Sequence, residues 1–196
     1  MEMKDIESAV EGILFAAGEP VEVQRLCAVL ELDRETVDAV VRALADRYAY
    51  ERRGMRILTL EDRYQMCSAP EHAEIIRRAL ETRKPPQLSQ PALEALAVIA
   101  YFQPATRAFV EQIRGVDSAY TVKLLAERGL IEEAGRLAAP GRPALFRTTT
   151  LFLRCFGLSS LEDLPPLPDS GEDGQLSLEL EQAVAQLRRE QESAEA

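Results

Sequence analysis

The sequence has few of the residues that enzymes most often use for chemistry. Its 196 residues include one histidine, His72, and three cysteines, Cys27, Cys67 and Cys155, which are far apart and form no CxxC pair. The sequence therefore lacks the histidines that a histidine-based metal site needs, and it offers only His72 for a Ser-His-Asp triad. Cys27 lies on the apolar side of an expected helix, where a thiol packs like a small hydrophobic side chain. We expect no metal site and no catalytic residue.

The glycine-rich loops that bind nucleotides are also missing. Neither GxxxxGK[ST] nor GxGxxG occurs, and the backbone amides of such loops are what hold phosphate groups. Acidic pairs such as Glu132-Glu133 are explained more simply as the solvated end of a strand than as a catalytic dyad. These absences predict a protein that is not an enzyme and binds no cofactor.

Long hydrophobic runs are absent too, and none approaches the length of a membrane span. The first residues, MEMKDIESAV, are acidic and lack the basic start and apolar stretch of a signal peptide. Hydrophobic residues make up 46% and charged residues 29% of the chain, as in an ordinary soluble globular protein. We therefore predict a cytoplasmic protein without membrane contact.

Positive charge is scarce in every part of the chain, whose net charge is -10. Residues 1–84 hold 13 basic and 17 acidic side chains, residues 85–168 hold 8 of each, and residues 169–196 hold 2 and 8. Nonspecific affinity for DNA comes mainly from Lys and Arg side chains that neutralise phosphates. Since no segment is a basic patch, DNA contact is expected to be weak or indirect.

Hydrophobic spacing in the first half predicts three helices, a hairpin and a further helix. The stripe Ile6, Val10 and Leu14 is typical of a helix, and Asp33 suits the N-cap of the third helix. A Glu-Asp-Arg turn between two β-prone runs indicates a hairpin. In order, these elements are expected in DIESAVEGILFAA, VEVQRLCAVLEL, RETVDAVVRALADRYAYERR, MRILTLEDRYQMCSA and HAEIIRRALETRK.

The second half repeats the same plan. Pro20 and Pro104 are 84 positions apart (104 − 20), and Asp33 and Asp117 keep the same offset. Thr106 and Asp117 are the expected N-caps of the second and third helices of this half. Its three helices and two strands are expected in PALEALAVIAYF, TRAFVEQIRG, DSAYTVKLLAERG, LIEEAGRL and PALFRTTT, with a PGRP turn between the strands.

The pattern predicts a mainly α fold with small β-hairpin wings, that is, α+β, built from two tandem winged helix-turn-helix domains. The expected domains are residues 1–84 and 91–158. They are joined by a linker, residues 85–90, after adjacent prolines that cannot continue a helix. Residues 159–196 are rich in acid and proline and are predicted to form a disordered tail with a possible short helix, which adds nothing to folded stability.

Winged helices often bind DNA, so a transcriptional regulator with two such domains is the alternative to a protein-binding role. A helix that reads DNA presents hydrogen-bond donors at its N-terminal half. The first candidate helix presents mixed charge, and the second presents Ser118, Thr121, Lys123 and Glu127. Arg136, Arg142 and Arg147 around the second wing are the best positive cluster. These arginines fit phosphates or the acids of a protein partner equally well.

Apolar side chains are a second candidate for a surface that binds another protein. The run LEALAVIAYF is apolar nearly all round, which is more than a helix facing one small core requires. The surplus fits burial within its own domain, a neighbouring domain, a second subunit or a partner segment. The stripe of Ile6, Val10 and Leu14 likewise fits either core burial or a self-complementary patch between two copies.

Several segments together closely resemble segregation and condensation protein B of bacteria, over about residues 4–168. Phe102 stands where that family usually has Lys before Gln-Pro, and Arg147 where it commonly has Gly before Thr-Thr. The segments that carry the resemblance are LAVIAYFQPATR, IRGVDS, LLAERGLIEEAGR, PGRP and FGLSSLEDLPPL, with IESAVEGILFAAGEPV and RYQMCSAP in the first half.

The resemblance implies a tandem winged-helix subunit that forms a homodimer and binds the kleisin subunit, segregation and condensation protein A. Together the two join the Smc ATPase in the bacterial condensin complex, which compacts and segregates chromosomes for cell division. The ATP chemistry of that complex belongs to Smc. The resemblance thus implies a cytoplasmic protein on the nucleoid, with dimerisation expected in the first domain and partner binding in the second.

We predict that the kleisin binds the second domain. Aromatic and arginine side chains are the usual anchors of an interface, although Tyr101 also fits a core position and Arg114 a helix-end cap. On this interpretation the PGRP turn supports protein contacts rather than DNA reading. The candidate contact residues are Tyr101, Phe102, Gln103, Arg107, Arg114 and Arg142.

Overall fold

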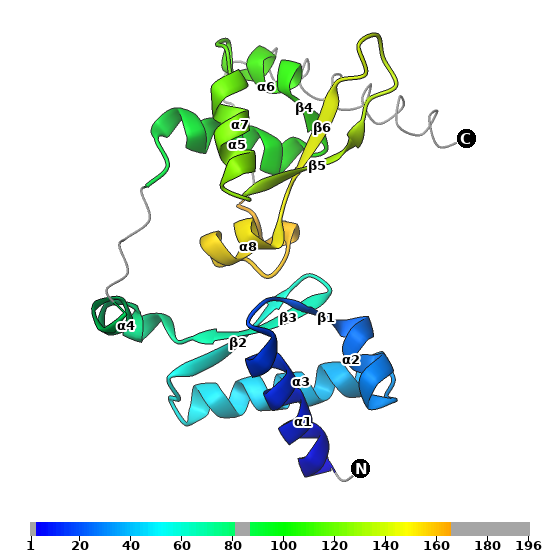
Figure 1. Ribbon diagram of the computed structural model, residues 1–196, viewed down its shortest axis with the longest axis vertical. Coiled ribbons are helices and arrows are strands. Elements are labelled where there is room, and N and C mark those ends of the chain that lie inside the picture. The colour runs from blue at the N-terminus through cyan, green and yellow to red at the C-terminus, as the bar shows by residue number, and fades with distance from the viewer. Residues whose placement is uncertain (1–2, 81–86, 166–196) are drawn as a thin grey trace. The chain divides into compact units, whose positions relative to one another are not determined.

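The chain divides into two compact units, each a winged helix-turn-helix (Figure 1). The structure, a computed structural model, describes residues 3–80 and 87–165. Of the described residues, one unit contains 3–80 and 157–160, and the other contains 87–156 and 161–165.

In the first unit, a helix-turn-helix is followed by a three-stranded sheet. Asp33 caps the third helix as predicted: its Oδ1 accepts a hydrogen bond from the Thr36 amide at 2.9 Å. That backbone hydrogen bond holds the pKa of the Asp33 carboxyl below its usual range. The elements are α1 (Met3–Ala17), β1 (Val21–Glu22), α2 (Val23–Leu30), α3 (Arg34–Tyr50), β2 (Met55–Leu60), β3 (Arg63–Ser68), the 3₁₀ turn η1 (Pro70–His72) and α4 (Ala73–Ala79).

The sheet of the first unit is tied to its helices by a very short strand. Gly18, at φ 66°, lies just past the end of α1 in the left-handed region that favours glycine. The two residues of β1 then pair antiparallel with β3, Val21 opposite Tyr64, and α2 begins at the next residue. The strand order is β1-β3-β2. The Gln65 side chain adds a hydrogen bond to the Gly18 carbonyl at 3.2 Å.

In the second unit the same elements recur in the same order as far as the last strand, after which a helix precedes the 3₁₀ turn. Thr106 is an N-cap as predicted, because its hydroxyl accepts a hydrogen bond from the Phe109 amide at 3.2 Å. The elements are α5 (Gln90–Phe102), β4 (Ala105–Thr106), α6 (Arg107–Arg114), α7 (Ala119–Glu127), β5 (Ile131–Arg136), β6 (Ala144–Thr148), α8 (Thr150–Phe156) and the 3₁₀ turn η2 (Leu161–Asp163).

The structure confirms the internal repeat. Strand β4 follows β1 by 84 residues (105 − 21), and α6 follows α2 by the same offset (107 − 23). Both of these helices end in a left-handed residue, Glu31 at φ 56° and Gly115 at φ 69°. The second sheet has the order β4-β6-β5, which matches β1-β3-β2 element by element.

Both units bury the apolar faces of their own helices. In the first unit Ile6, Val10 and Leu14 are at most 6% exposed. The idea that this stripe supplies a self-complementary surface patch was therefore wrong, because the side chains fill the core. In the second unit, α5 packs against α6, α7 and β6. Its buried residues are Ala92, Ala95, Leu96, Val98, Ile99 and Ala100.

Three local predictions need correction. The segment after Thr149 forms the helix α8, where no helix was expected, and it buries Phe152 and Leu153. The tail was predicted to be disordered from residue 159, but the chain is ordered to Pro165 and includes η2. The remaining tail, with its possible short helix, lies outside the described residues. Helix α4 is shorter than expected and ends at Ala79.

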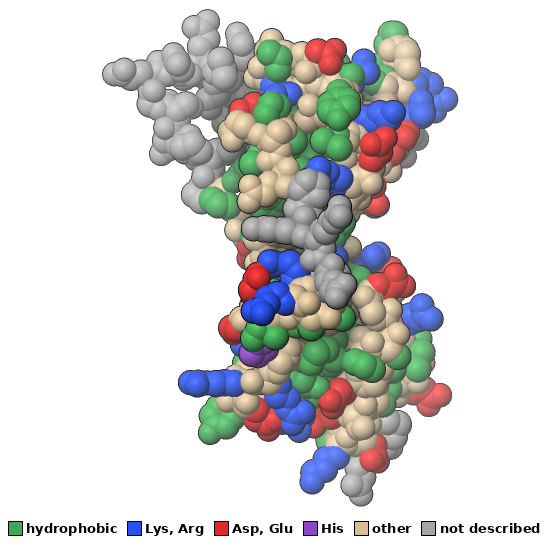
Figure 2. Space-filling model, turned by 60° about the vertical axis from the view of Figure 1, so that its left-hand side comes forward, with side chains coloured by type: hydrophobic (Ala, Val, Ile, Leu, Met, Phe, Trp, Pro, Cys, Tyr) green, Lys and Arg blue, Asp and Glu red, His purple; other side chains and the backbone are tan. Residues whose placement is uncertain are grey.

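Charges of both signs are mixed over the surface. On the face shown in Figure 2, Lys and Arg side chains lie beside Asp and Glu side chains, with hydrophobic ones between them. None of the helices in residues 3–80 and 87–165 has the length and apolar character that a membrane span needs.

Leu44 tests the core of the first unit, since it is 2% exposed on the buried face of α3. Leu44→Ala removes buried methyl groups and leaves a cavity, so we expect the free energy of unfolding to fall by about 2–5 kcal/mol. Urea denaturation followed by circular dichroism measures this. Val29→Ala is the control, because Val29 lies on α2 and is 65% exposed. Equal effects of the two substitutions would contradict the placement of α3.

Candidate functional site

Four of the six predicted contact residues lie together where α5 ends and α6 begins. Tyr101 and Phe102 close α5, Gln103 follows them, and Arg107 is the first residue of α6. The two residues of β4 between the helices pair with β6, Ala105 opposite Phe146. We call the surface of Tyr101, Phe102, Gln103 and Arg107 the α5–α6 corner.

The two aromatic residues of the corner are half-buried and held in place. The Phe102 ring packs edge-on against Phe109 of α6, with ring centroids 5.8 Å apart and an interplanar angle of 68°. The Tyr101 hydroxyl donates a hydrogen bond to the Pro165 carbonyl at 2.6 Å. Each side chain thus has an anchored edge and a partly open one, an arrangement that suits an interface aromatic.

Gln103 joins the corner to the wing. Its Oε1 accepts hydrogen bonds from the Thr148 amide at 2.7 Å and from the Thr148 hydroxyl at 3.0 Å. Its Nε2 donates to the Ala100 carbonyl at 3.2 Å. Because both ends of the amide have partners within the unit, Gln103 positions the corner by linking α5 to β6.

Arg107 carries the positive charge of the corner. Its side chain is 58% exposed, and its Nε lies 3.2 Å from Glu111 Oε1, one turn further along α6. An exposed ion pair of this kind contributes little to stability. The guanidinium can therefore exchange this partner for an acidic group of another protein at small cost.

Arg114, at the other end of α6, lies inside the fold. Its side chain is only 7% exposed, lies 3.3 Å from Glu94 of α5 and donates to the Ser118 hydroxyl at 2.6 Å. Ser118 is fully buried, and its amide donates to Glu111 Oε1 at 3.3 Å. These contacts fix the turn between α6 and α7. Arg114 is thus a positioning residue in this structure.

The sequence pattern missed the part that Ser118 plays. It was expected on the exposed face of a reading helix, but it is the buried N-cap residue of α7. Asp117, the predicted cap, accepts a hydrogen bond from the Ala119 amide at 3.0 Å. The burial of Ser118 depends on Arg114 reaching it across the turn, which no local signal indicates.

Arg142 lies in the turn of the second wing. It is exposed, its φ of 41° is in the left-handed region, and its carbonyl accepts a hydrogen bond from Arg136 at 3.4 Å. Among the residues that the structure describes, no hydrogen bond or ion pair joins Arg142 to the α5–α6 corner. Arg142 therefore lies on the wing and shares no hydrogen bond or ion pair with Tyr101, Phe102, Gln103 or Arg107 among the described residues.

The other wing arginines have acidic neighbours on β5. Arg136 lies 3.2 Å from Glu133, and Arg147 lies 2.7 Å from Glu132. On the exposed side of α7, Lys123 lies 3.7 Å from Glu127, and Tyr120 is 77% exposed. Phosphates approaching this side would meet a carboxylate beside each of these three cations.

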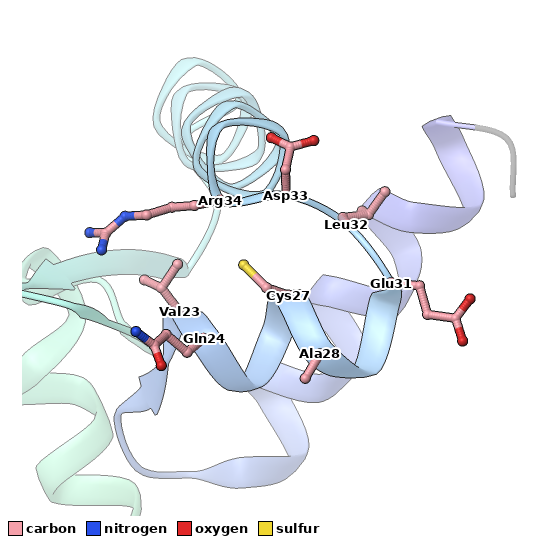
Figure 3. A pocket seen from close by; sticks show the side chains of 8 residues that line it. All are labelled: Val23, Gln24, Cys27, Ala28, Glu31, Leu32, Asp33 and Arg34. Carbon is pink, nitrogen blue, oxygen red and sulfur yellow. The ribbon is translucent and has the colours of Figure 1, made fainter.

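A groove lies beside the helix-turn-helix of the first unit, with a volume of about 630 Å³. Figure 3 shows the Cys27 sulfur pointing into it between α2 and the start of α3. The Asp33 carboxylate is used as the helix cap, and Arg34 donates a hydrogen bond to Asp62 at 2.5 Å. The lining residues are Val23, Gln24, Cys27, Ala28, Glu31, Leu32, Asp33 and Arg34.

The groove lacks the grouping of side chains that catalysis needs. Its lining includes one thiol and no histidine, and the charges of Asp33 and Arg34 are held by structural contacts. Within residues 3–80 and 87–165, no cluster of three or more His, Cys, Asp or Glu side chains is arranged to hold a metal ion. The groove is thus an open hollow with a lining of mixed charge.

Comparison with known proteins gives consistent matches. Residues 8–167 match the family described as segregation and condensation complex subunit ScpB. Segregation and condensation protein B of Ruminiclostridium cellulolyticum is 46% identical over 167 residues, which cover 85% of this chain and 88% of that protein.

Solved structures are similar to this chain as well. The crystal structure of ScpB from Mycobacterium tuberculosis is 31% identical, with 81% of this chain and 98% of that chain covered, at a TM-score of 0.40. A dimer of ScpB N-terminal domain complexed with ScpA peptide is 28% identical, with 40% and 99% covered, at a TM-score of 0.38. By the family match and the identity to its relatives, this chain belongs to the segregation and condensation protein B family.

Proposed function

We propose that this protein is the non-enzymatic ScpB-type subunit of a bacterial Smc condensin complex. In this role it forms a homodimer, binds the kleisin ScpA and, through it, joins the Smc ATPase in chromosome condensation and segregation. It works in the cytoplasm, associated with the nucleoid. The observation that carries the proposal is the family match over residues 8–167, which spans both winged-helix units.

Within the second unit, the α5–α6 corner is the proposed docking site for the kleisin. Phe102 offers a half-exposed ring that Phe109 already holds in one orientation, which lowers the entropy lost on binding. Arg107 beside it is exposed and suits an acidic partner residue. Tyr101 and Gln103 position the corner, Arg114 fixes the turn behind it, and Arg142 offers a further cation from the wing.

Direct DNA reading is not supported by the surface of the second unit. The three cations Lys123, Arg136 and Arg147 each lie within 3.7 Å of a glutamate. Because a glutamate lies beside each of these cations, this surface has little of the net positive charge that binding to a polyanion such as DNA requires. The winged-helix units accordingly present surfaces for binding other proteins.

The docking site is tested by measuring the affinity of the kleisin for Phe102→Ala and Arg107→Glu. Loss of an interface anchor is expected to weaken binding by about 2 kcal/mol, or about thirtyfold in Kd. Isothermal titration calorimetry gives the affinity, and circular dichroism establishes that both variants fold.

Matched controls come from α7 of the same unit. Lys123→Glu reverses a charge that, like Arg107, lies one turn before a glutamate, and Tyr120→Ala removes an exposed aromatic ring. Both controls are expected to bind the kleisin like the wild type. If Phe102→Ala and Arg107→Glu also fold and bind normally, the corner is not the docking site, and the groove of the first unit is examined next.

A salt titration on duplex DNA separates this proposal from the transcriptional regulator. A regulator binds its site tightly, and its affinity falls steeply as salt rises because phosphate contacts release counterions. For this protein we expect only weak binding that is indifferent to sequence. A nanomolar site at physiological salt would refute the protein-binding role of the winged helices.

A further inference from the structure

The C-terminal part of the chain that lies outside the described residues begins at the α5–α6 corner. Pro165 is the last described residue, and its carbonyl accepts a hydrogen bond from the Tyr101 hydroxyl at 2.6 Å. Residues 166–196 therefore start beside the surface proposed for the kleisin. Residues 168–196 also lie beyond residues 8–167, the part of the chain that matches the family.

The sequence of this segment is complementary in charge to the corner. Residues 169–196 contain 8 acidic and 2 basic side chains. At the corner, the side chain of Arg107 is 58% exposed, and its exposed ion pair with Glu111 is exchanged for another carboxylate at small cost. The first three acids of the segment are Asp169, Glu172 and Asp173.

The length of the chain allows these acids to reach Arg107. The eight residues from Pro165 to Asp173 span up to about 28 Å when extended. The six residues from Tyr101 to Arg107 span at most about 21 Å. Because Pro165 is bonded to Tyr101, the chain that follows it is long enough to bring a carboxylate to the Arg107 guanidinium.

Leucines follow the acids directly and suit the aromatic part of the corner. Leu176, Leu178 and Leu180 occur within five residues of sequence. The Phe102 ring packs against Phe109 and is otherwise half-exposed. A leucine placed on its open side removes apolar surface of both side chains from water. The segment thus carries both kinds of group that the corner suits, a carboxylate for Arg107 and an apolar side chain for Phe102.

We propose that residues 169–180 dock on the α5–α6 corner of the same chain and compete with the kleisin for it. The competition rests on the proposed function, because it requires that the kleisin bind this corner. A segment tethered beside its site needs little intrinsic affinity, since its effective concentration there is in the millimolar range. The apparent affinity for the kleisin falls in proportion to the fraction of chains whose corner is open.

Docking is measured without the kleisin by a tryptophan in the segment. The chain contains no tryptophan, so Leu178→Trp gives the full chain a single indole whose fluorescence reports its exposure to water. We expect emission at a shorter wavelength than that of a solvated tryptophan, independent of protein concentration. Adding Arg107→Glu is expected to restore the solvated wavelength, whereas Lys123→Glu, at an exposed cation on α7, is not.

Two results of this measurement would overturn docking within the chain. One is the emission of a solvated tryptophan in the chain that carries Leu178→Trp alone. The other is a shift that appears only as the protein concentration rises, because the segment then binds a second copy.

Competition is measured as the affinity of the full chain for the kleisin after the three leading acids are reversed together, as Asp169→Lys, Glu172→Lys and Asp173→Lys. We expect binding to strengthen at least about threefold, which corresponds to a corner that the segment occupies about two thirds of the time. The matched control reverses three acids at the end of the chain, as Glu190→Lys, Glu192→Lys and Glu195→Lys. It changes the net charge equally and is expected to bind like the wild type.

The two measurements separate this inference from the proposed function. Equal strengthening by both triple variants would overturn the competition, because overall charge would then explain the effect. A docked tryptophan that saturating kleisin does not release would overturn it as well. If no variant and not the wild type binds the kleisin, the proposed function is wrong, and the emission of the tryptophan still decides whether the segment docks.

Discussion

Two residues of strand pairing hold each helix-turn-helix to its wing, and the rest of each unit is built around that connection. In the first unit, Val21 and Glu22 pair with β3, and α2 starts at the next residue. In the second, Ala105 and Thr106 pair with β6, and α6 starts directly after them. Because the strand is so short, the end of one helix, the sheet edge and the start of the next helix are confined to one corner. That confinement brings the end of α5 to the start of α6, where Phe102 packs against Phe109.

The repeated frame serves different surfaces in its two copies. The buried positions correspond, as with Leu26 and Val110 or Val41 and Leu125, which are all at most 2% exposed. The exposed positions do not correspond: Phe15 on α1 is 71% exposed, whereas Ile99, 84 residues later on α5, is fully buried. The two units therefore share their buried positions and differ at their exposed ones, as expected when each unit binds a different partner.

Hydrophobic periodicity and turn residues predicted most of the fold because they report local structure. The caps at Asp33 and Thr106 were identified from residue type and position alone. Strands β1 and β4 were missed, since two residues are too few to show alternation. Helix α8 was missed because a run of threonines precedes it, although the Thr149 hydroxyl, which accepts a hydrogen bond from the Phe152 amide at 3.3 Å, was a usable N-cap signal.

The candidate site was predictable only in part, because its architecture depends on contacts between distant segments. Residue type pointed to Phe102 and Arg107, and the fold brings them to one corner. It did not reveal that Arg114 is buried against Ser118 and Glu94, since that depends on how α5, α6 and α7 pack.

The central claim is that these winged helices bind proteins of a chromosome-organising complex. The most direct measurement is affinity purification of the full chain from its own cells under native conditions, treated with nuclease and quantified by mass spectrometry. The account predicts that the kleisin and the Smc ATPase are the two proteins most enriched, and that nuclease does not release them. Enrichment of neither protein, or their loss when the DNA is digested, would contradict it.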